Sequence, residues 1–252
     1  APASSRPALI HAIEHLSLQA SRSDDLRQLY FGELGALCGD GRWLPRISDS
    51  VGPVQVVEKQ EEAGGDRGLV SSQSLMPGDL ILVCNPLARA PSFALFQALT
   101  PVLEDVVKRS PWAGRVVSVL SDGSDRQMRP SLNLRDLVRG GAVDLDADGP
   151  HPLPDVDLSK VAKTNAFGDL GWDAIFPTVA LLNHSCAPNC GLSVLGEAVL
   201  VRAREPVGQA EALTISYFDT LTTLGERTSL TESTWGFRCC CKRCEAERAL
   251  GE

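Results

Sequence analysis

The apolar positions of the chain change their period near residue 50. Over residues 7–38 they recur every three or four positions, which predicts helices in this segment. Beyond it they form short runs, and turns that contain glycine or proline separate one run from the next. Such runs predict strands at 54–57, 69–70 and 80–83. The chain thus begins helical and continues into a β region.

Helical spacing returns in the middle of the chain. Phenylalanine, leucine and valine recur at helical intervals over residues 91–120, and a shorter amphipathic piece follows near 132–138. After Lys163 the pattern predicts strands again, at 192–195, 198–201 and 213–217. The first two of these flank a Gly-Glu turn and form a predicted hairpin. Strands on both sides of a helical insertion predict an α+β fold of short strands.

Composition narrows the class of protein. The 252 residues are 43% hydrophobic and 22% charged, which is typical of a globular protein with a buried core. The net charge of -8 gives no general attraction to nucleic-acid phosphates, so we expect no direct nucleic-acid contact. No apolar run approaches the length of about 18 residues that a membrane helix needs. The first residues also lack a secretion-signal pattern, so we expect an intracellular protein in the nucleus or cytoplasm.

The cysteines gather at the end of the chain. Of eight cysteines, four occupy positions 239, 240, 241 and 244. Adjacent cysteines rarely reach the geometry of a disulfide bond. A tight cluster without a secretion signal is therefore better interpreted as a set of metal ligands. Cys239, Cys241 and Cys244 supply three thiolates, whereas a tetrahedral zinc site needs a fourth ligand.

Three polar motifs follow one another in the second half of the chain. They are Asn-His-Ser-Cys at 183–186, Glu-Ala-Leu-Thr-Ile-Ser-Tyr at 211–217 and Phe-Arg-Cys-Cys-Cys-Lys-Arg-Cys at 237–244. In this order they resemble a SET-domain protein lysine methyltransferase with its post-SET cysteine motif, and most of all the SMYD-type branch. Asp-Arg-Gly-Leu at 66–69 and Leu-Met-Pro-Gly-Asp-Leu at 75–80 resemble the opening strands of the family.

The chain departs from the family pattern at two places. No cysteine occurs between Cys84 and Cys186, so the MYND zinc finger that is usual in the SMYD branch is absent. Asp66 stands where the family has the first glycine of its Gly-x-Gly loop. The preceding Gly64-Gly65 gives this loop room to adjust.

The resemblance implies a SET-type β fold of short strands and a division of the chain. We expect an N-terminal helical segment at residues 1–50 and the SET domain at 51–225, with a helical insertion at about 91–160. A post-SET zinc-binding tail is expected at residues 226–252. The resemblance also supplies Cys186 as the fourth ligand of one structural zinc ion. Cys190 is the competing candidate, and Cys240, between two ligands, is expected to point away.

The resemblance implies S-adenosyl-L-methionine as the methyl donor. The residues that match the family's cofactor-binding positions are Arg67, Gly68, Asn165, Asn183, His184 and Phe237. His184 is expected to act largely through its backbone, and Phe237 by stacking on the adenine ring. For a lone histidine such as His184, the alternative is a buried histidine that only satisfies its hydrogen bonds.

Tyr217 is the expected catalytic residue, because it ends the second motif. The resemblance places its hydroxyl beside the departing methyl group. A lysine amine has an ordinary pKa of about 10.4, so it must lose a proton before it attacks. A nearby sulfonium and an apolar channel both lower that pKa, and no dedicated base is then required. Phe167 and Trp235 match aromatic walls of the lysine channel, with ordinary core packing as the alternative.

The predicted function is therefore S-adenosylmethionine-dependent methylation of a protein lysine, on a histone or a non-histone target. The alternative is a catalytically silent SET domain that binds a peptide or protein. The expected partner is the protein substrate, with no membrane involved. The sequence identifies neither the substrate nor the degree of methylation or the oligomeric state.

Overall fold

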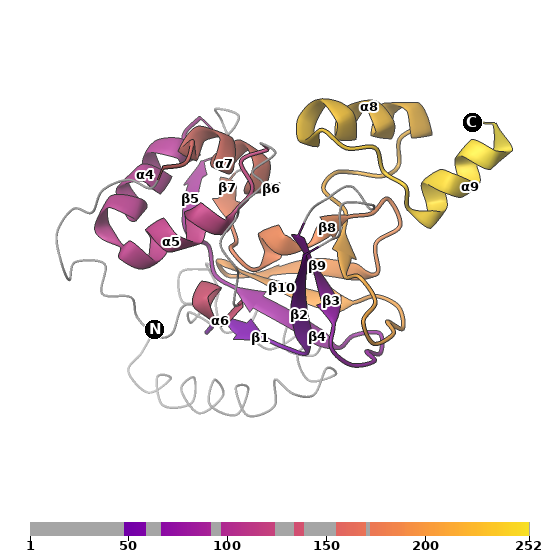
Figure 1. Cartoon of the computed structure of the whole chain (residues 1–252), viewed down its shortest axis with the longest axis horizontal. Coiled ribbons are helices and arrows are strands. Elements are labelled where there is room, and N and C mark those ends of the chain that lie inside the picture. The colour runs from indigo at the N-terminus through magenta and orange to yellow at the C-terminus, as the bar shows by residue number, and fades with distance from the viewer. Residues whose placement is uncertain are drawn as a thin grey trace, which may run out of the picture.

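The computed structural model describes residues 48–58, 67–91, 97–123, 134–138, 155–169 and 172–251. The helices expected over residues 7–38 lie outside these ranges, and so does Asp66. The described part is an α+β structure of short strands and helices, as predicted (Figure 1).

The largest sheet has four antiparallel strands in the order β1-β4-β10-β9. These strands are β1 (Ser50–Val51), β4 (Leu80–Cys84), β10 (Ala198–Ala203) and β9 (Cys190–Leu195). β9 and β10 form the predicted hairpin, with Ala198 opposite Leu195. Gly196 in its turn has a φ of 64°, which lies in the left-handed region that favours glycine.

The described residues form three smaller sheets besides the first. Two of them are antiparallel. One pairs β2 (Val54–Glu58) with β3 (Arg67–Ser71). The other has the order β5-β7-β6 and consists of β5 (Ala88–Pro91), β7 (Trp172–Ile175) and β6 (Ala166–Asp169). The third joins β8 (Asn183–His184) to β11 (Thr214–Ile215) in parallel. The strand predicted at 213–217 is thus a ladder of only two residues, because the pairing ends at Ile215 and the chain bends at Tyr217 and Phe218.

The described parts of the insertion between β5 and β6 contain four helices. They are α4 (Leu99–Arg109), α5 (Pro111–Val119), α6 (Leu134–Leu137) and α7 (Leu158–Asn165). Ser110 separates α4 from α5, and its side chain accepts a hydrogen bond from the N–H of Ala113. α7 was not predicted, since its eight residues are too few to establish a period. Asp157 begins this helix by accepting from the N–H groups of Ser159 and Lys160.

The C-terminal tail is helical, which the hydrophobic pattern did not predict. α8 (Leu224–Trp235) and α9 (Lys242–Leu250) carry few apolar residues, so neither shows a clear apolar face. α8 begins instead with a capping box, in which Thr223 and Glu226 each accept from the other's backbone N–H. It ends at Gly236, whose φ is 74°. In Figure 1 α8 and α9 lie at the right of the view, opposite α4, α5 and α7.

Two hydrophobic clusters hold the site region together. The main core includes Phe176, Leu182 and Ile215, together with the short 3-10 helix η5 (Val179–Leu181). A separate small cluster joins Cys186, Leu224, Cys239 and Cys244. The tail therefore packs onto the loop that follows β8. Among the described residues, no helix has the length and apolar character that crossing a membrane requires.

Candidate functional site

The site is built where β8 and β11 run side by side. Asn183 pairs with Thr214 and His184 with Ile215, although more than twenty-five residues separate the two strands in sequence. The N–H of Ser185 extends the pairing by donating to the carbonyl of Ile215 over 2.9 Å. This pairing brings the first two motifs of the sequence into one structure.

Asn189 locks the two segments together. Its amide group donates to the carbonyl of Ala212 over 2.8 Å, and its side-chain oxygen accepts from the N–H of Thr214 over 2.9 Å. The residue is buried, so both bonds are shielded from water. Sequence reasoning did not select Asn189, although it lies three positions after Cys186 within the polar stretch that follows β8.

The imidazole of His184 bridges two functional candidates. Its Nδ1 accepts a hydrogen bond from the backbone N–H of Tyr217 over 3.2 Å, and its Nε2 lies 3.3 Å from Sγ of Cys186. Because Nδ1 accepts, this network assigns the ring proton to Nε2. Burial, followed by the positive charge of Arg227, lowers the pKa of His184 to about 4. The ring is therefore neutral at pH 7.

Aromatic rings enclose His184. The ring of Phe218 stacks on it with centroids 4.7 Å apart, while the rings of Tyr217 and Phe237 lie at 5.2 and 6.0 Å. Trp235, at the end of α8, lies 5.2 Å from the ring of Tyr217. The structure thus brings four predicted site residues into one aromatic group. Phe218 is a fifth member that the sequence analysis did not identify, although it directly follows Tyr217.

The hydroxyl of Tyr217 is anchored within this group. It donates to the carbonyl of Leu182 over 2.8 Å, just before β8. The backbone N–H and the side chain of Tyr217 are thus both tied to the segment 182–184. This double attachment fixes the direction of the phenol ring.

Gly68 and Asn183 meet at close range. The amide of Asn183 donates to the carbonyl of Arg67 over 3.4 Å. A Cβ atom placed on Gly68 would overlap Nδ2 of Asn183, so only glycine fits here without a shift. The Arg67 guanidinium itself is buried and donates to the carbonyl of Val119 at the end of α5. Arg67 therefore faces Asn183 with its backbone.

Asn165 and Phe167 lie at the end of α7 and in β6. Asn165 is buried at the end of α7 and donates to the carbonyls of Ser121 and Val161, over 2.6 and 2.8 Å. Phe167 in β6 packs edge to face on Phe176, with ring centroids 5.9 Å apart. The described contacts of Asn165 are thus with α7 and the segment after α5, and those of Phe167 are with the core.

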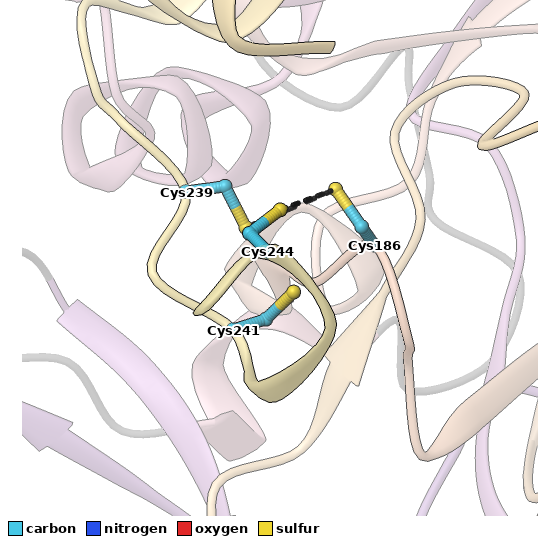
Figure 2. A group of neighbouring side chains, drawn as sticks. All are labelled: Cys186, Cys239, Cys241 and Cys244. Carbon is cyan, nitrogen blue, oxygen red and sulfur yellow. Dashed lines mark hydrogen bonds between the residues drawn. The ribbon is translucent and has the colours of Figure 1, made fainter. Parts of the chain in front are cut away.

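Four cysteine side chains converge at the tail. Figure 2 shows Cys239, Cys241 and Cys244 of the tail facing Cys186 of the loop after β8. All four sulfurs lie within 4.8 Å of one another, and Cys186 is 3.9 Å from Cys239 and 3.5 Å from Cys244. Tetrahedral zinc with bonds of about 2.3 Å places its sulfurs about 3.8 Å apart. This donor set therefore fits a zinc ion.

The other two candidates lie elsewhere. Cys190 is buried in β9, where its thiol donates to Oδ1 of Asn189. Cys240 is exposed and donates to the carbonyl of Arg238. Of the two cysteines proposed for the fourth position, the structure thus places Cys186, and not Cys190, within the group.

Burial and hydrogen bonds within the group shift the pKa values of the clustered thiols. Burial raises the pKa of Cys186, and it raises the pKa of Cys239 and Cys244 to about 11. Burial acts in the same direction on Cys241, but hydrogen bonds from the backbone of Cys244 and Cys186 and from the side chain of Cys239 outweigh it and lower its pKa. A bound divalent cation deprotonates such thiols outright and compensates the cost of burying their charged form.

Comparison with known proteins agrees with the motifs. The SET domain family matches residues 66–218, which is more than half of the chain. The chain is 40% identical over 73 residues to the histone-lysine N-methyltransferase SMYD3 of Homo sapiens and 36% identical over 74 residues to the N-lysine methyltransferase SMYD2-A of Danio rerio. It is 39% identical over 107 residues to the histone-lysine N-methyltransferase ASHR1 of Arabidopsis thaliana.

These matches cover only part of each protein. They span 29%, 29% and 36% of this chain, in the same order, and 17%, 17% and 22% of the relatives. The similarity to SMYD-type relatives is thus concentrated in a short stretch.

Proposed function

Because this chain belongs to the SET domain family, we propose that it transfers a methyl group from S-adenosyl-L-methionine to a lysine side chain of a protein. One observation carries the proposal more than any other. The His184 ring touches both the backbone of Tyr217 and the sulfur of Cys186, so a candidate catalytic residue and a candidate metal centre meet at one side chain. This position between the two motifs supports a role for His184 in the site.

The cofactor would lie against the Asn183-His184 strand. Asn183, the backbone of Arg67-Gly68 and the ring of Phe237 would hold it. The missing side chain at Gly68 supports this assignment, because it keeps the backbone within reach of the Asn183 amide. Asn165 has its amide N–H groups committed to Ser121 and Val161, so we propose only its carbonyl oxygen for contact. When bound, the cofactor supplies a methyl group on a positively charged sulfonium.

The chain's own residues would prepare the amine. The half-buried rings of Tyr217, Trp235 and Phe237 offer an apolar environment, which lowers the pKa of a lysine by disfavouring its charged form. The hydroxyl of Tyr217 would orient the neutral amine through its oxygen. Its two attachments to residues 182–184 support this role, because orientation depends on a fixed position. Phe167 would contribute to the channel from β6.

The four cysteines would hold one structural zinc ion. Cys186 lies in the loop after β8, whereas Cys239, Cys241 and Cys244 belong to the tail, so the ion would join the two segments. We propose residues 51–225 as the catalytic unit and 226–252 as the zinc-binding tail. The boundary at 225 falls in the first turn of α8.

The substrate would be a histone or a non-histone protein, met in the nucleus or cytoplasm. The SMYD3, SMYD2-A and ASHR1 relatives are lysine methyltransferases by name, two of them for histone lysine, which supports a protein lysine as acceptor.

A two-stage experiment tests this function. Calorimetric titration of S-adenosylmethionine into the zinc-loaded protein should give saturable binding, and radiolabelled methyl should then appear on lysines of histones or of a panel of whole proteins. Absence of binding would overturn the proposal. Binding without transfer to any substrate would indicate the silent, peptide-binding alternative instead.

A further inference from the structure

Arg227 is a buried charge beside the cysteine group. It lies on α8 with a relative exposure of 1%. Its Nη2 pairs with the carboxylate of Glu247 on α9, and its Nη1 donates to the carbonyl of Thr222. Removing a guanidinium from water is costly unless its charge is compensated. Such a residue needs a reason beyond helix packing.

The cysteines supply that reason. Arg227 lies beside this group, because it pairs with Glu247, three positions after Cys244 on α9, and the side chains of Cys244 and Cys186 favour its charged form. Burial opposes the charge of Arg227, but the hydrogen bonds with Glu247, Cys244 and Cys186 outweigh it and raise its pKa. Its Nε–H is buried and has no hydrogen-bond partner among the described residues.

The net charge of the residues around the cysteines also supports a role for Arg227 at the metal site. A divalent cation held by four thiolates carries two negative charges in excess, which a buried site must compensate. Around this group Arg227 and Arg243 share the carboxylate of Glu247, and Arg248 donates to the carbonyl of Cys239. Three guanidinium groups and one carboxylate leave two positive charges in excess.

We propose that Arg227 is the buried counter-charge of the four-cysteine centre, and that it sets how tightly the centre holds its metal ion. This inference rests on the proposed zinc site but not on methyl transfer. Glu247 then serves to position Arg227, and Arg243 and Arg248 complete the compensation. Partners outside the ligand set commonly change metal affinity by about 10–100-fold when they are replaced.

The alternative explanation is that Arg227 affects metal binding only through the packing of the tail. Arg227 would merely tether α9 to α8 through its ion pair with Glu247, and the metal would respond only because the tail loosens. The two explanations differ in what they expect of Glu247. Glu247→Gln keeps a side-chain oxygen that accepts from Arg227, but it adds one net positive charge beside the sulfurs and removes the ion pair.

Chelator competition on the zinc-loaded full chain separates the explanations. Arg227→Met, of similar length but uncharged, should weaken zinc binding by about 10–100-fold, whereas Arg227→Lys should recover part of the loss. Glu247→Gln should bind zinc at least as tightly as the unchanged protein. A joint loss in Arg227→Met and Glu247→Gln would overturn the proposal in favour of the tether. Arg238→Met is the matched control, because Arg238 is exposed in the same tail.

Two further readouts keep the test decisive. If Arg227→Met does not fold, zinc binding should still be weaker in Arg227→Lys than in the unchanged protein, and no weaker in Glu247→Gln. The cobalt-substituted protein should also show a shift of its thiolate-to-metal absorption band in Arg227→Lys but not in Arg238→Met, and an unmoved band would contradict contact with the sulfurs. An unchanged protein that binds no zinc would instead refute the proposed centre itself.

Discussion

The backbone N–H of Tyr217 donates to Nδ1 of His184 across 3.2 Å. The opposite nitrogen of the same ring lies 3.3 Å from Sγ of Cys186. One imidazole thus spans the distance between the proposed catalytic tyrosine and the proposed metal centre. Folding of the tail onto Cys186 would fix this ring, and the ring would fix the backbone of Tyr217.

Substitutions of His184 should separate these two contacts. In His184→Asn the shorter amide can still accept from the N–H of Tyr217 but cannot reach Cys186, whereas His184→Leu loses both contacts. We expect zinc to dissociate about tenfold faster in both variants, and turnover to fall much further in His184→Leu. Stopped-flow zinc release and methyl-transfer rates measure the two effects. Equal turnover in the two variants would contradict the role given to the Tyr217 contact.

Tyr217→Phe should abolish most of the activity. The variant loses the hydroxyl that is proposed to orient the amine, and misplacement of a reacting group costs about 100-fold in rate. The hydrogen bond to Leu182 contributes only about 1 kcal/mol, so the protein should remain folded. Cofactor affinity should stay within about twofold of the unchanged protein. Rates with saturating cofactor, together with a thermal melt, test this, and unchanged turnover would remove the proposed role.

Replacement of single cysteines should identify the metal ligands. Cys186→Ser, in the group of four, should lower the zinc content well below one ion per chain and expose the tail to proteolysis. Cys190→Ser and Cys240→Ser are matched controls, because these residues lie outside the group. Elemental analysis with limited proteolysis gives both readouts. Full zinc content in Cys186→Ser would refute the ligand set.

The sequence predicted those parts of the structure that local pattern determines. The apolar runs at 80–83, 192–195 and 198–201 correspond to β4 and to the β9–β10 hairpin. The same reasoning missed α7, because eight residues capped by Asp157 are too short to show a helical period. It also missed α8 and α9, whose stability depends on caps and on contacts with the cysteine loop rather than on an apolar face.

The site was predictable only as far as its motifs are local. Asn183, His184 and Tyr217 stand in polar stretches that interrupt apolar runs, and the structure brings them together through β8 and β11. Arg227 could not be found in this way, since a lone arginine in a polar helix looks like a solvated surface residue. Its burial depends on contacts with Glu247 and the cysteines, which only the folded tail creates.

Cys84 and Cys190, which are buried outside the metal group, should resist alkylation. Burial, the largest cause in both, raises the pKa of Cys84 from 9.0 to about 12 and that of Cys190 to about 11. At pH 8 their thiolate fraction, and so their reaction with iodoacetamide, should be at least about 100-fold lower than that of an ordinary thiol. Exposed Cys240 should react readily. Peptide mass spectrometry of the native protein measures each site.

The same shifts predict a loss of stability at high pH. In the unfolded chain these thiols ionise near pH 9, whereas in the folded protein they stay protonated until about pH 11–12. Their contribution to folding is therefore complete below pH 9 and is lost as the pH rises through the folded values. Urea unfolding at pH 8 and pH 10 should show the decrease, and Cys84→Ala should reduce it. A midpoint that does not change with pH would contradict the burial of these thiols.

Three glycine-to-alanine substitutions should have three different outcomes. In Gly68→Ala the new methyl group overlaps Nδ2 of Asn183, so the amide must turn away from the proposed cofactor position. We expect cofactor affinity to fall by about tenfold or more, with at most a modest loss of stability.

Gly191→Ala meets only the flexible side chain of Arg204 at 3.2 Å, which can move aside. Gly225→Ala meets nothing within 4 Å and lies in α8, where alanine should stabilise the helix by about 0.5–1 kcal/mol. Calorimetric titration of S-adenosylmethionine and thermal melts compare all three, and equal affinity in Gly68→Ala and Gly191→Ala would exclude Gly68 and Asn183 from the cofactor site.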